Sequence, residues 1–485
     1  MNRTAFIKQS GWALRALAVI IAMLAGFAPL SASAADHKIV VIADPHVMAP
    51  ELLTNSDNAD WTTYLDVSRK LIDYSQALFD QVLADISEMT TKPELVLIVG
   101  DLTKDGEQAS HAYVKSKLDD LGITTLVIPG NHDLGTVDAK AYGETTTDVA
   151  TISKDDFATI YADYGYGASS RREETTLTYA CEPVEGLVVI GIDSGTDGIL
   201  SEATLKWVCD EAKAARAAGK QVIAMMHHPL IPHITSGEVF VSTVSVDDYE
   251  NVRNSLADAG ISIVFTGHFH TSDIAKDWNG DMSKPIYDVT TGSLCSYPCD
   301  YRVVTLSVAM TSMSIATESI ASTAGTSLSG EAFSTATAKS RLERSVNSVM
   351  SQKIKAKLME SGKSEMIASL AASLITPEVV KAYIFHAEGN ENENENAQGL
   401  LESLVGLLQS YPEYNYMVNS MLQDKSNYGD AQREDQTNDR TLSVGVPGDA
   451  NDDKVVNVAD IVKLVNDNAP QSDIDEVVKI IMQNK

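Results

Sequence analysis

The sequence predicts a mixed α/β fold for about residues 38–320, followed by a mainly helical region and a small C-terminal unit. Short runs of β-branched and aliphatic residues alternate with segments of helical periodicity, and glycine, asparagine or proline stands shortly after several of these runs. The length of 485 residues allows two to four domains, and a hydrophobic fraction of 44% with 21% charged residues is ordinary for a globular protein.

Strands are expected at 39–43, 95–99, 125–128, 187–192, 222–226 and 261–265, where apolar runs of strand length occur. Between the first two runs, apolar residues from Leu71 to Ile86 recur at helical spacing, and 107–121, 201–218 and 248–259 have the pattern of further helices. This alternation favours a layered, sheet-centred structure. Residues 286–290, 301–308 and 312–316 are expected as later, hairpin-linked strands.

The first 34 residues have the features of a secretory signal peptide. Three basic residues and no acid precede the apolar run 16–30, which ends in small residues up to Ala35. We therefore expect an exported protein, periplasmic or extracellular. A retained membrane anchor is the alternative, which the Ala-x-Ala end disfavours. No later stretch is apolar and long enough to suggest a membrane span after cleavage.

The net charge limits the classes of binding partner, and the cysteine content limits the possible disulfides. A net charge of -30 argues against nucleic acid or an anionic membrane as the main partner, but not against small phosphate compounds, because a bound metal reverses the charge locally. Export permits disulfides. The four cysteines, Cys181, Cys209, Cys295 and Cys299, allow three pairings, and free buried thiols are equally compatible with the sequence.

Polar residues that suit metal binding gather in five short clusters, most of them directly after a predicted strand. Six of the ten histidines lie in these clusters, which are Asp44-Pro45-His46, Gly100-Asp101, Gly130-Asn131-His132-Asp133, His227-His228-Pro229 and Gly267-His268-Phe269-His270. Carboxylate, amide oxygen and imidazole together suit borderline divalent metals. Loops at the carboxyl ends of strands are where open α/β sheets build their sites.

In this order and placement, the five clusters resemble the calcineurin-like metallophosphoesterase superfamily over about residues 38–310. The resemblance implies a four-layer αββα sandwich with two metal ions, Fe, Mn, Zn or Co, that hydrolyse phosphate mono- or diesters through a metal-bridging hydroxide. It assigns Asp44, His46 and His270 to one ion, Asn131, His227 and His268 to the other, and Asp101 to both. His227 is preferred to His228 because it is the first residue past its strand.

The same resemblance keeps His132 off the metals and points it at the substrate phosphoryl group, either to stabilise the transition state or to protonate the leaving oxygen. Asp133 is a catalytic candidate because it could orient His132, as could Asp105. A catalytically silent phosphoester-binding or scaffold protein, presented through its C-terminal unit, is the alternative. The complete ligand set disfavours it.

The remaining sequence divides into two parts after the predicted 36–320 domain. Residues 321–445 form a mainly helical extension with an acidic low-complexity loop at 388–398, and its polar end, 425–445, is expected to be flexible. Residues 446–485 resemble the first repeat of a type I dockerin, which implies a cohesin-like protein partner. Calcium ligands are expected at Asp449, Asn451, Asp453, the Val455 carbonyl, Asn457 and Asp460, with Lys454 where such loops have glycine.

Overall fold

The computed structural model describes residues 36–234, 243–307 and 312–389, and then 434–435, 438–445, 458–466, 474, 477–478 and 481. The predicted signal peptide at 1–34 lies outside the described residues, so export stays a prediction. Two large β-sheets form the centre of the described chain.

The six-stranded sheet carries the first three predicted strands in parallel. Its order is β16 (Thr441–Gly445), β14 (Ser312–Ser319), β13 (Asp300–Leu306), β1 (His37–Ile42), β2 (Leu95–Val99) and β3 (Thr125–Ile128). β1, β2 and β3 are parallel, whereas β13, β14 and β16 run antiparallel to their neighbours. All five residues of β2 are buried, as in a strand covered on both faces.

The second sheet has eight strands with a parallel centre, β8, β9, β10 and β12. Its order is β15 (Glu434–Asp435), β11 (Asp273–Trp278), β12 (Pro285–Thr290), β10 (Ile263–Thr266), β9 (Gln221–Met226), β8 (Leu187–Ile192), β7 (Tyr179–Val184) and β6 (Arg171–Arg172). The sheets face one another, and the Tyr179 hydroxyl donates to the Val127 carbonyl at 3.0 Å between them.

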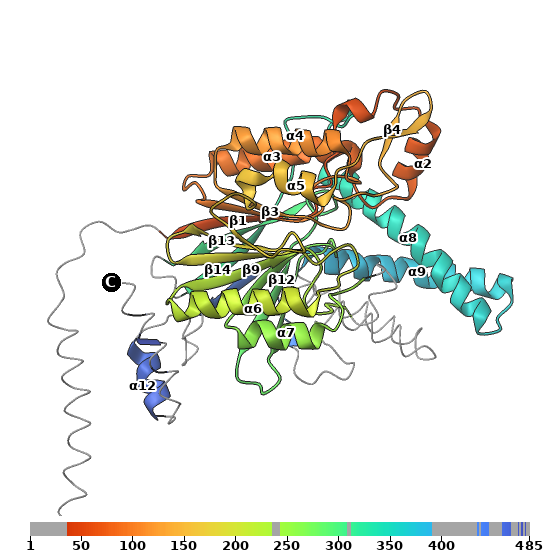
Figure 1. Ribbon diagram of the computed structural model, residues 1–485. Coiled ribbons are helices and arrows are strands. Elements are labelled where there is room, and N and C mark those ends of the chain that lie inside the picture. The colour runs from red at the N-terminus through yellow and green to blue at the C-terminus, as the bar shows by residue number, and fades with distance from the viewer. Residues whose placement is uncertain are drawn as a thin grey trace, which may run out of the picture. The chain divides into compact units, whose positions relative to one another are not determined.

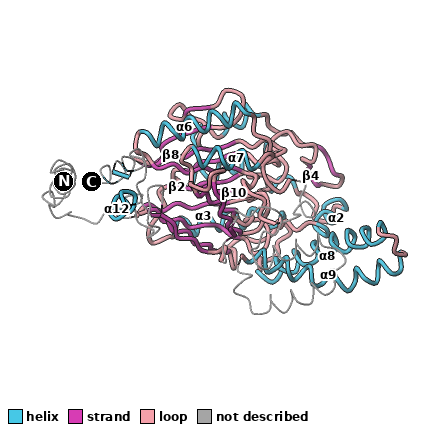
Figure 2. Tube along the Cα trace, turned by 90° about the horizontal axis from the view of Figure 1, so that it is seen from below, coloured by secondary structure: helices cyan, strands magenta, loops and turns pink. Residues whose placement is uncertain are grey.

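Helices cover the outer faces of both sheets, so that the layers run helix, sheet, sheet, helix (Figure 1). α3 (Ser75–Glu88) and α4 (Gln108–Leu121) lie on the six-stranded side, and α6 (Glu202–Ala217) and α7 (Tyr249–Asp258) lie on the eight-stranded side. Figure 2 shows the same helices and strands from below, with the strands in magenta and the helices in cyan. The mixed α/β fold expected from the sequence is confirmed.

Several short elements escaped the periodicity analysis because they are too short to show a repeat. They are α2 (Ala59–Val67), β4 (Lys140–Tyr142), β5 (Thr146–Asp148), α5 (Lys154–Ile160), and the 3₁₀ turns η1 (Pro50–Leu52), η2 (Ile72–Tyr74) and η3 (Ala162–Tyr164). Four cysteines, all free, are buried among the described residues. Of the alternatives that the sequence leaves open, the structure therefore has free thiols at Cys181, Cys209, Cys295 and Cys299 and no disulfide among them.

The extension contains two long helices, α8 (Thr335–Glu360) and α9 (Glu365–Glu388), which pack against one another. The expectation that 425–445 is flexible needs correction for its last part. β16 pairs with β14 along Thr441–Gly445, and the alternate residues Leu442 and Val444 are buried. The buried Asp439 carboxylate accepts a hydrogen bond from the Ile274 amide at 2.7 Å, which ties this segment to β11.

One described helix, α9, is long and apolar enough to cross a membrane by length and composition, with 44% of its most apolar window buried. The sequence expectation that no stretch after the signal would pass this test is corrected accordingly. Its buried residues include Ala368, Ala372, Val379 and Tyr383, which belong to the hydrophobic core. A core helix has the same composition, so this feature is weak evidence for a membrane span.

α8 is joined to the sandwich through a buried ion pair with the segment that precedes α3. The Arg341 guanidinium pairs with both Asp73 carboxylate oxygens, with Nη2 at 3.0 Å from Oδ2. The Ser345 hydroxyl donates to the Val67 carbonyl at 2.7 Å, at the end of α2. α2 and α8 lie side by side in both views (Figures 1 and 2).

We expect Arg341→Met to lower the free energy of unfolding by about 3 kcal/mol, because it leaves the Asp73 carboxylate buried without its partner. Lys381→Met is the matched control, since it removes an exposed pair with Glu378 on α9 and should cost less than about 1 kcal/mol. Urea unfolding followed by circular dichroism measures both. Equal stability of the two variants would contradict a structural role for the Arg341 pair.

Candidate metal centre

The five motif clusters meet where strands of both sheets end. Asp44 and His46 follow β1, Asp101 follows β2 and Asn131 follows β3, while His227 follows β9 and the 268–270 turn follows β10. Backbone hydrogen bonds hold neighbouring loops together, including the His46 amide to the Asp101 carbonyl at 2.9 Å and the Gly267 amide to the His227 carbonyl at 3.0 Å. Two sheets thus contribute to one site.

The backbone at this site is strained. Asp44, His46, Asp101, His268 and His270 have φ between +43° and +67°, although none is glycine. Left-handed φ values are uncommon for such residues and cost free energy, so they persist where the surrounding structure imposes them. These turns aim the side chains back towards one point. The pairs Asp44/His46 and His268/His270 therefore converge through left-handed turns and not through the side-chain alternation of an extended strand.

One group of candidate ligands consists of Asp44, His46, Asp101 and His270, whose donor atoms all lie within 4.8 Å of one another. His46 Nε2 is 3.2 Å from His270 Nε2 and 3.6 Å from Asp101 Oδ2. Asp44 Oδ1 is 3.5 Å from His270 Nε2. All four side chains are buried.

The second group consists of Asp101, His227 and His268, again within 4.8 Å. Asn131 Oδ1 lies 3.0 Å from His227 Nε2 and 2.9 Å from His268 Nδ1, so Asn131 joins this group. Asp101 Oδ2 is 3.4 Å from His227 Nε2, which makes Asp101 common to both groups. His228 lies beside them, with its Nδ1 at 2.8 Å from the Ser194 hydroxyl.

Backbone carbonyls fix which ring nitrogen faces the centre. His227 Nδ1 donates to the Val99 carbonyl at 2.9 Å, and His268 Nε2 donates to the Thr243 carbonyl at 3.0 Å. The opposite ring nitrogens therefore turn lone pairs towards the Asn131 and Asp101 oxygens. Such convergence of acceptors requires a shared proton or a cation, and carbonyl partners of this kind orient metal-binding histidines. The residues fit a pair of metal ions.

Electrostatics at the centre agree with a cation site. Burial raises the pKa of Asp44 to about 7, reinforced by Asp101 and opposed by His227. Burial also lowers the pKa of His268 to about 3, which favours the neutral imidazole that metals bind. For His227, burial is outweighed by Asp101, and the pKa rises to about 9. A metal ion would replace that proton.

His132 lies at the edge of the two groups and is partly exposed. Its backbone amide donates to Asp101 Oδ1 at 2.8 Å, and its Nδ1 is 2.7 Å from Asp105 Oδ1. The Asp105 carboxylate also pairs with Lys104. Burial raises the pKa of Asp105, but the hydrogen bond to His132 and the charge of Lys104 outweigh this effect and hold the pKa below its ordinary value. Asp105 is thus the charged partner of the His132 ring.

The structure corrects the catalytic expectation for Asp133. Its carboxylate is fully buried and accepts hydrogen bonds from the amides of Leu102, Thr103 and Gly130, at 3.1, 2.9 and 2.8 Å, and from the Thr103 hydroxyl at 2.9 Å. These partners engage both oxygens and fix the loops that follow β2 and β3. Asp133 therefore positions the ligand loops, and Asp105 takes the place beside His132.

One residue near the centre, Lys70, is not predicted from the sequence. It lies in the short connection between α2 and η2, and its Nζ is 3.1 Å from His132 Nε2. It belongs to none of the five motifs, and a lysine on a connecting segment is usually a solvated surface residue. Only the fold brings this segment beside the loop that follows β3.

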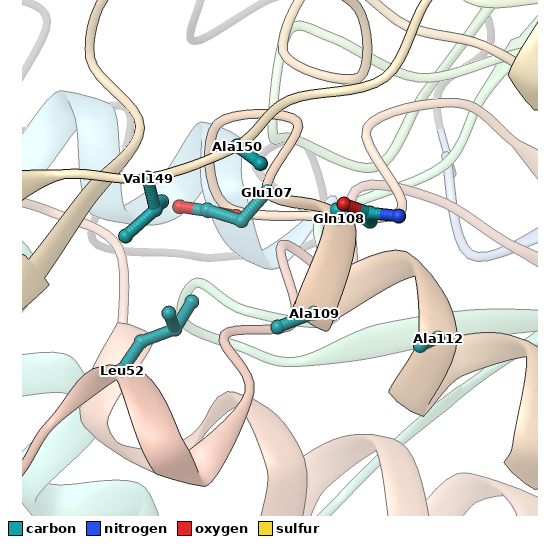
Figure 3. Close-up of a pocket in the computed structure, with 7 residues that line it drawn as sticks. All are labelled: Leu52, Glu107, Gln108, Ala109, Ala112, Val149 and Ala150. Carbon is teal, nitrogen blue, oxygen red and sulfur yellow. The ribbon is translucent and has the colours of Figure 1, made fainter.

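A separate pocket of about 390 Å³ shares no residue with the two metal groups (Figure 3). The side chains that line it are mostly small and apolar: Leu52, Glu107, Gln108, Ala109, Ala112, Val149 and Ala150. Glu107 Oε2 accepts a bond from the Asp105 amide at 3.2 Å, so the pocket lies against the segment that carries Asp105.

Most of the predicted calcium ligands lie outside the described residues: Asp449, Asn451, Asp453, Val455 and Asn457. Asp460 is described and is buried in α12 (Val458–Asn466). Calcium binding by this segment therefore remains a prediction.

Comparison with known proteins gives one family match. Residues 37–272 match the family model described as calcineurin-like phosphoesterase. The chain is 24% identical over 191 residues to a probable glycerophosphodiester phosphodiesterase of Arcobacter nitrofigilis, covering 39% of this chain and 58% of that protein. It is 23% identical over 248 residues to a probable cyclic nucleotide phosphodiesterase of Rhodococcus erythropolis, covering 49% of this chain and 66% of that protein.

These alignments span less than two thirds of either relative. Among solved structures, a dimetal phosphatase from Danio rerio is similar with a TM-score of 0.42 and 12% identity, over 59% of this chain and 97% of that one.

We expect Asp101→Asn to reduce the metal content to below two ions per chain, because the neutral amide weakens the one ligand common to both groups. Asp210→Asn, on the exposed side of α6, is the matched control and should leave metal content unchanged. Mass spectrometry of metals after dialysis measures both. Full retention of two ions at unchanged affinity in Asp101→Asn would rule out the shared role.

Proposed function

We propose that residues 37–272, which match the calcineurin-like phosphoesterase family model, form a phosphoesterase domain that hydrolyses phosphate mono- or diesters with two metal ions. The observation that carries the proposal is the pair of candidate ligand groups, buried or partly buried, that share Asp101. Asp44, His46 and His270 would hold one ion, and Asn131, His227 and His268 the other, with Asp101 between them.

When bound, Fe, Mn, Zn or Co ions would supply a deprotonated water as nucleophile and neutralise charge on the phosphoryl oxygens. Asn131 is a neutral ligand, so it adds no negative charge to a site that must accept an anion. The Val99 and Thr243 carbonyls hold the His227 and His268 rings in the orientation that metal binding needs.

His132 and Asp105 are placed for proton transfer to the leaving group. As the water oxygen bonds to phosphorus, the P–O bond to the leaving group breaks. The oxygen of the leaving group then takes the proton from His132 Nε2. The Asp105 carboxylate accepts the Nδ1–H bond at 2.7 Å and stabilises the imidazolium that gives this proton. Water restores the proton to His132 after each turnover.

Both curated relatives described above are named as phosphodiesterases, so diesters are the first substrates to test. A catalytically silent scaffold is disfavoured by the convergence of the whole ligand set. Export to the periplasm or beyond is proposed from the signal-like residues 1–34 alone.

We expect His132→Ala to keep both metal ions and to lose about 10²- to 10⁴-fold in kcat on bis(p-nitrophenyl) phosphate, because a positioned acid is removed. The loss should be larger for alkyl esters, whose leaving groups need the proton more. His37→Ala is the control, a histidine on β1 paired with Glu94 away from the centre. Loss of a metal ion from His132→Ala would instead make His132 a ligand.

We also propose calcium binding by the 449–460 segment, supported by the ligand spacing in the sequence. Nothing in the described residues or in the comparisons supports a cohesin-like partner. Calorimetric titration of the full chain with calcium should show one site with a Kd of about 10⁻⁴–10⁻³ M. Asp453→Ala should abolish it, whereas Asp101→Asn should not. Equal heats from Asp453→Ala and the unaltered chain would exclude the loop.

A further inference from the structure

Lys70 brings a positive charge to the edge of the metal centre. Its Nζ lies 3.1 Å from His132 Nε2, the ring nitrogen that faces away from Asp105. The ammonium also feels the charges of Asp44, Asp101 and Asp105, which raise its pKa, while the larger effect of burial lowers it. Among the described residues, no carboxylate lies within ion-pair distance of Lys70. The charge therefore lacks a direct anionic partner.

Several hydrogen bonds fix the segment that carries this lysine. The Lys70 amide donates to the Ser68 hydroxyl at 3.0 Å, and the Leu71 amide donates to the Cys295 carbonyl at 2.7 Å. Arg69 Nη1 donates to the Tyr383 hydroxyl at 2.8 Å, and the Ser296 hydroxyl donates to the Arg69 carbonyl at 3.4 Å. A connection held at both its backbone and its side chains is more than a solvated turn.

Three of these partners lie beyond residue 272, where the family match ends. Cys295 and Ser296 belong to the turn before β13, and Tyr383 belongs to α9 of the helical extension. The buried Arg341–Asp73 pair holds the chain just after Lys70 to α8. The extension thus fixes a charged residue at the edge of a site whose metal ligands all come from the matched domain.

We propose that Lys70 is a substrate-contacting residue whose ammonium, beside His132 Nε2, donates to a phosphoryl oxygen of the ester. This rests on the proposed function. A buried or half-buried ammonium pairs favourably with phosphate oxygen as a charge-assisted hydrogen bond. Because Lys70 Nζ lies 3.1 Å from His132 Nε2, a phosphoryl oxygen that came within reach of Nε2 would also come within reach of the Lys70 ammonium and could take the place of Nε2 as the acceptor.

The competing explanation is that Lys70 merely orients His132. The two roles predict different measurements. Loss of an orienting contact lowers kcat and leaves the affinity for inorganic phosphate unchanged, since phosphate binding needs no proton transfer. Loss of a substrate contact weakens phosphate binding as well and raises KM. Arginine, which keeps the charge, should rescue part of the phosphate affinity only if Lys70 contacts the anion.

The test uses the metal-loaded full chain with inorganic phosphate as the calorimetric probe. We expect Lys70→Met to keep both metal ions and to weaken phosphate binding about 10- to 100-fold, the usual worth of a hydrogen bond to a charged group. Lys70→Arg should lie between Lys70→Met and the unaltered chain. Lys206→Met, at an exposed position on α6, is the matched control and should bind phosphate as the unaltered chain does. If Lys70→Met does not fold, Lys70→Gln replaces it, and we expect the same loss of phosphate affinity.

The outcomes separate this inference from the proposed function. Phosphate affinity and kinetics of Lys70→Met equal to those of Lys206→Met would overturn the inference while hydrolysis stands. An unaltered chain that turns over no ester, yet binds phosphate through Lys70, would overturn the proposed activity and the substrate role of Lys70, and would leave only its contact with the phosphate anion. If Lys70→Met has a reduced kcat but binds phosphate as the unaltered chain does, Lys70 only orients His132 and the inference is wrong. If the unaltered chain binds no phosphate, the inference is also overturned.

Discussion

The rest of the centre depends on the contacts that the Asp101 carboxylate makes with both sheets. Its Oδ2 lies near His46 from one sheet and His227 from the other, and its Oδ1 accepts the His132 amide. Two glycines make this possible. A Cβ at Gly130 would stand 2.2 Å from Asp101 Oδ1, and a Cβ at Gly100, where φ is +92°, would stand 2.5 Å from His227 Nδ1. The Gly-Asp and Gly-Asn-His-Asp motifs therefore describe one packed contact.

This centre gathers features that oppose folding: left-handed backbone at five candidate ligands, buried carboxylates and converging lone pairs. Their cost must be met by the sheets around them and by whatever cation binds. The Asp133 carboxylate shows how the scaffold helps, since its four hydrogen bonds tie the loops after β2 and β3 together without entering the centre. Rigid strands and over-determined loops hold a geometry that the isolated turns would not adopt.

Sequence patterns predicted the parts of the fold whose cause is local. The 95–99, 125–128 and 187–192 runs are strands at those positions, because each is a continuous apolar run bounded by turn residues. Segments whose structure depends on distant partners were missed. Thr441–Gly445 has only two apolar side chains, Leu442 and Val444, and follows a polar stretch, so it does not form a continuous apolar run; its strand pairs with the edge of β14. Lys70 and Asp105 were missed or left undecided for the same reason, since their roles depend on neighbours far along the chain.

The order of strands in the six-stranded sheet has a consequence for how the chain is made. β1 pairs with β13, so the first strand to emerge during synthesis waits for residues 300–306 before its second edge is covered. β14 in turn stays an open edge until Thr441–Gly445 is available. Open edges invite pairing with other chains, and long-range pairing folds slowly. Residues 37–272, which match the family model, lack β13, β14 and β16 and are therefore a poor folding unit by themselves. Until β16 has been synthesised, the nascent chain has an exposed sheet edge.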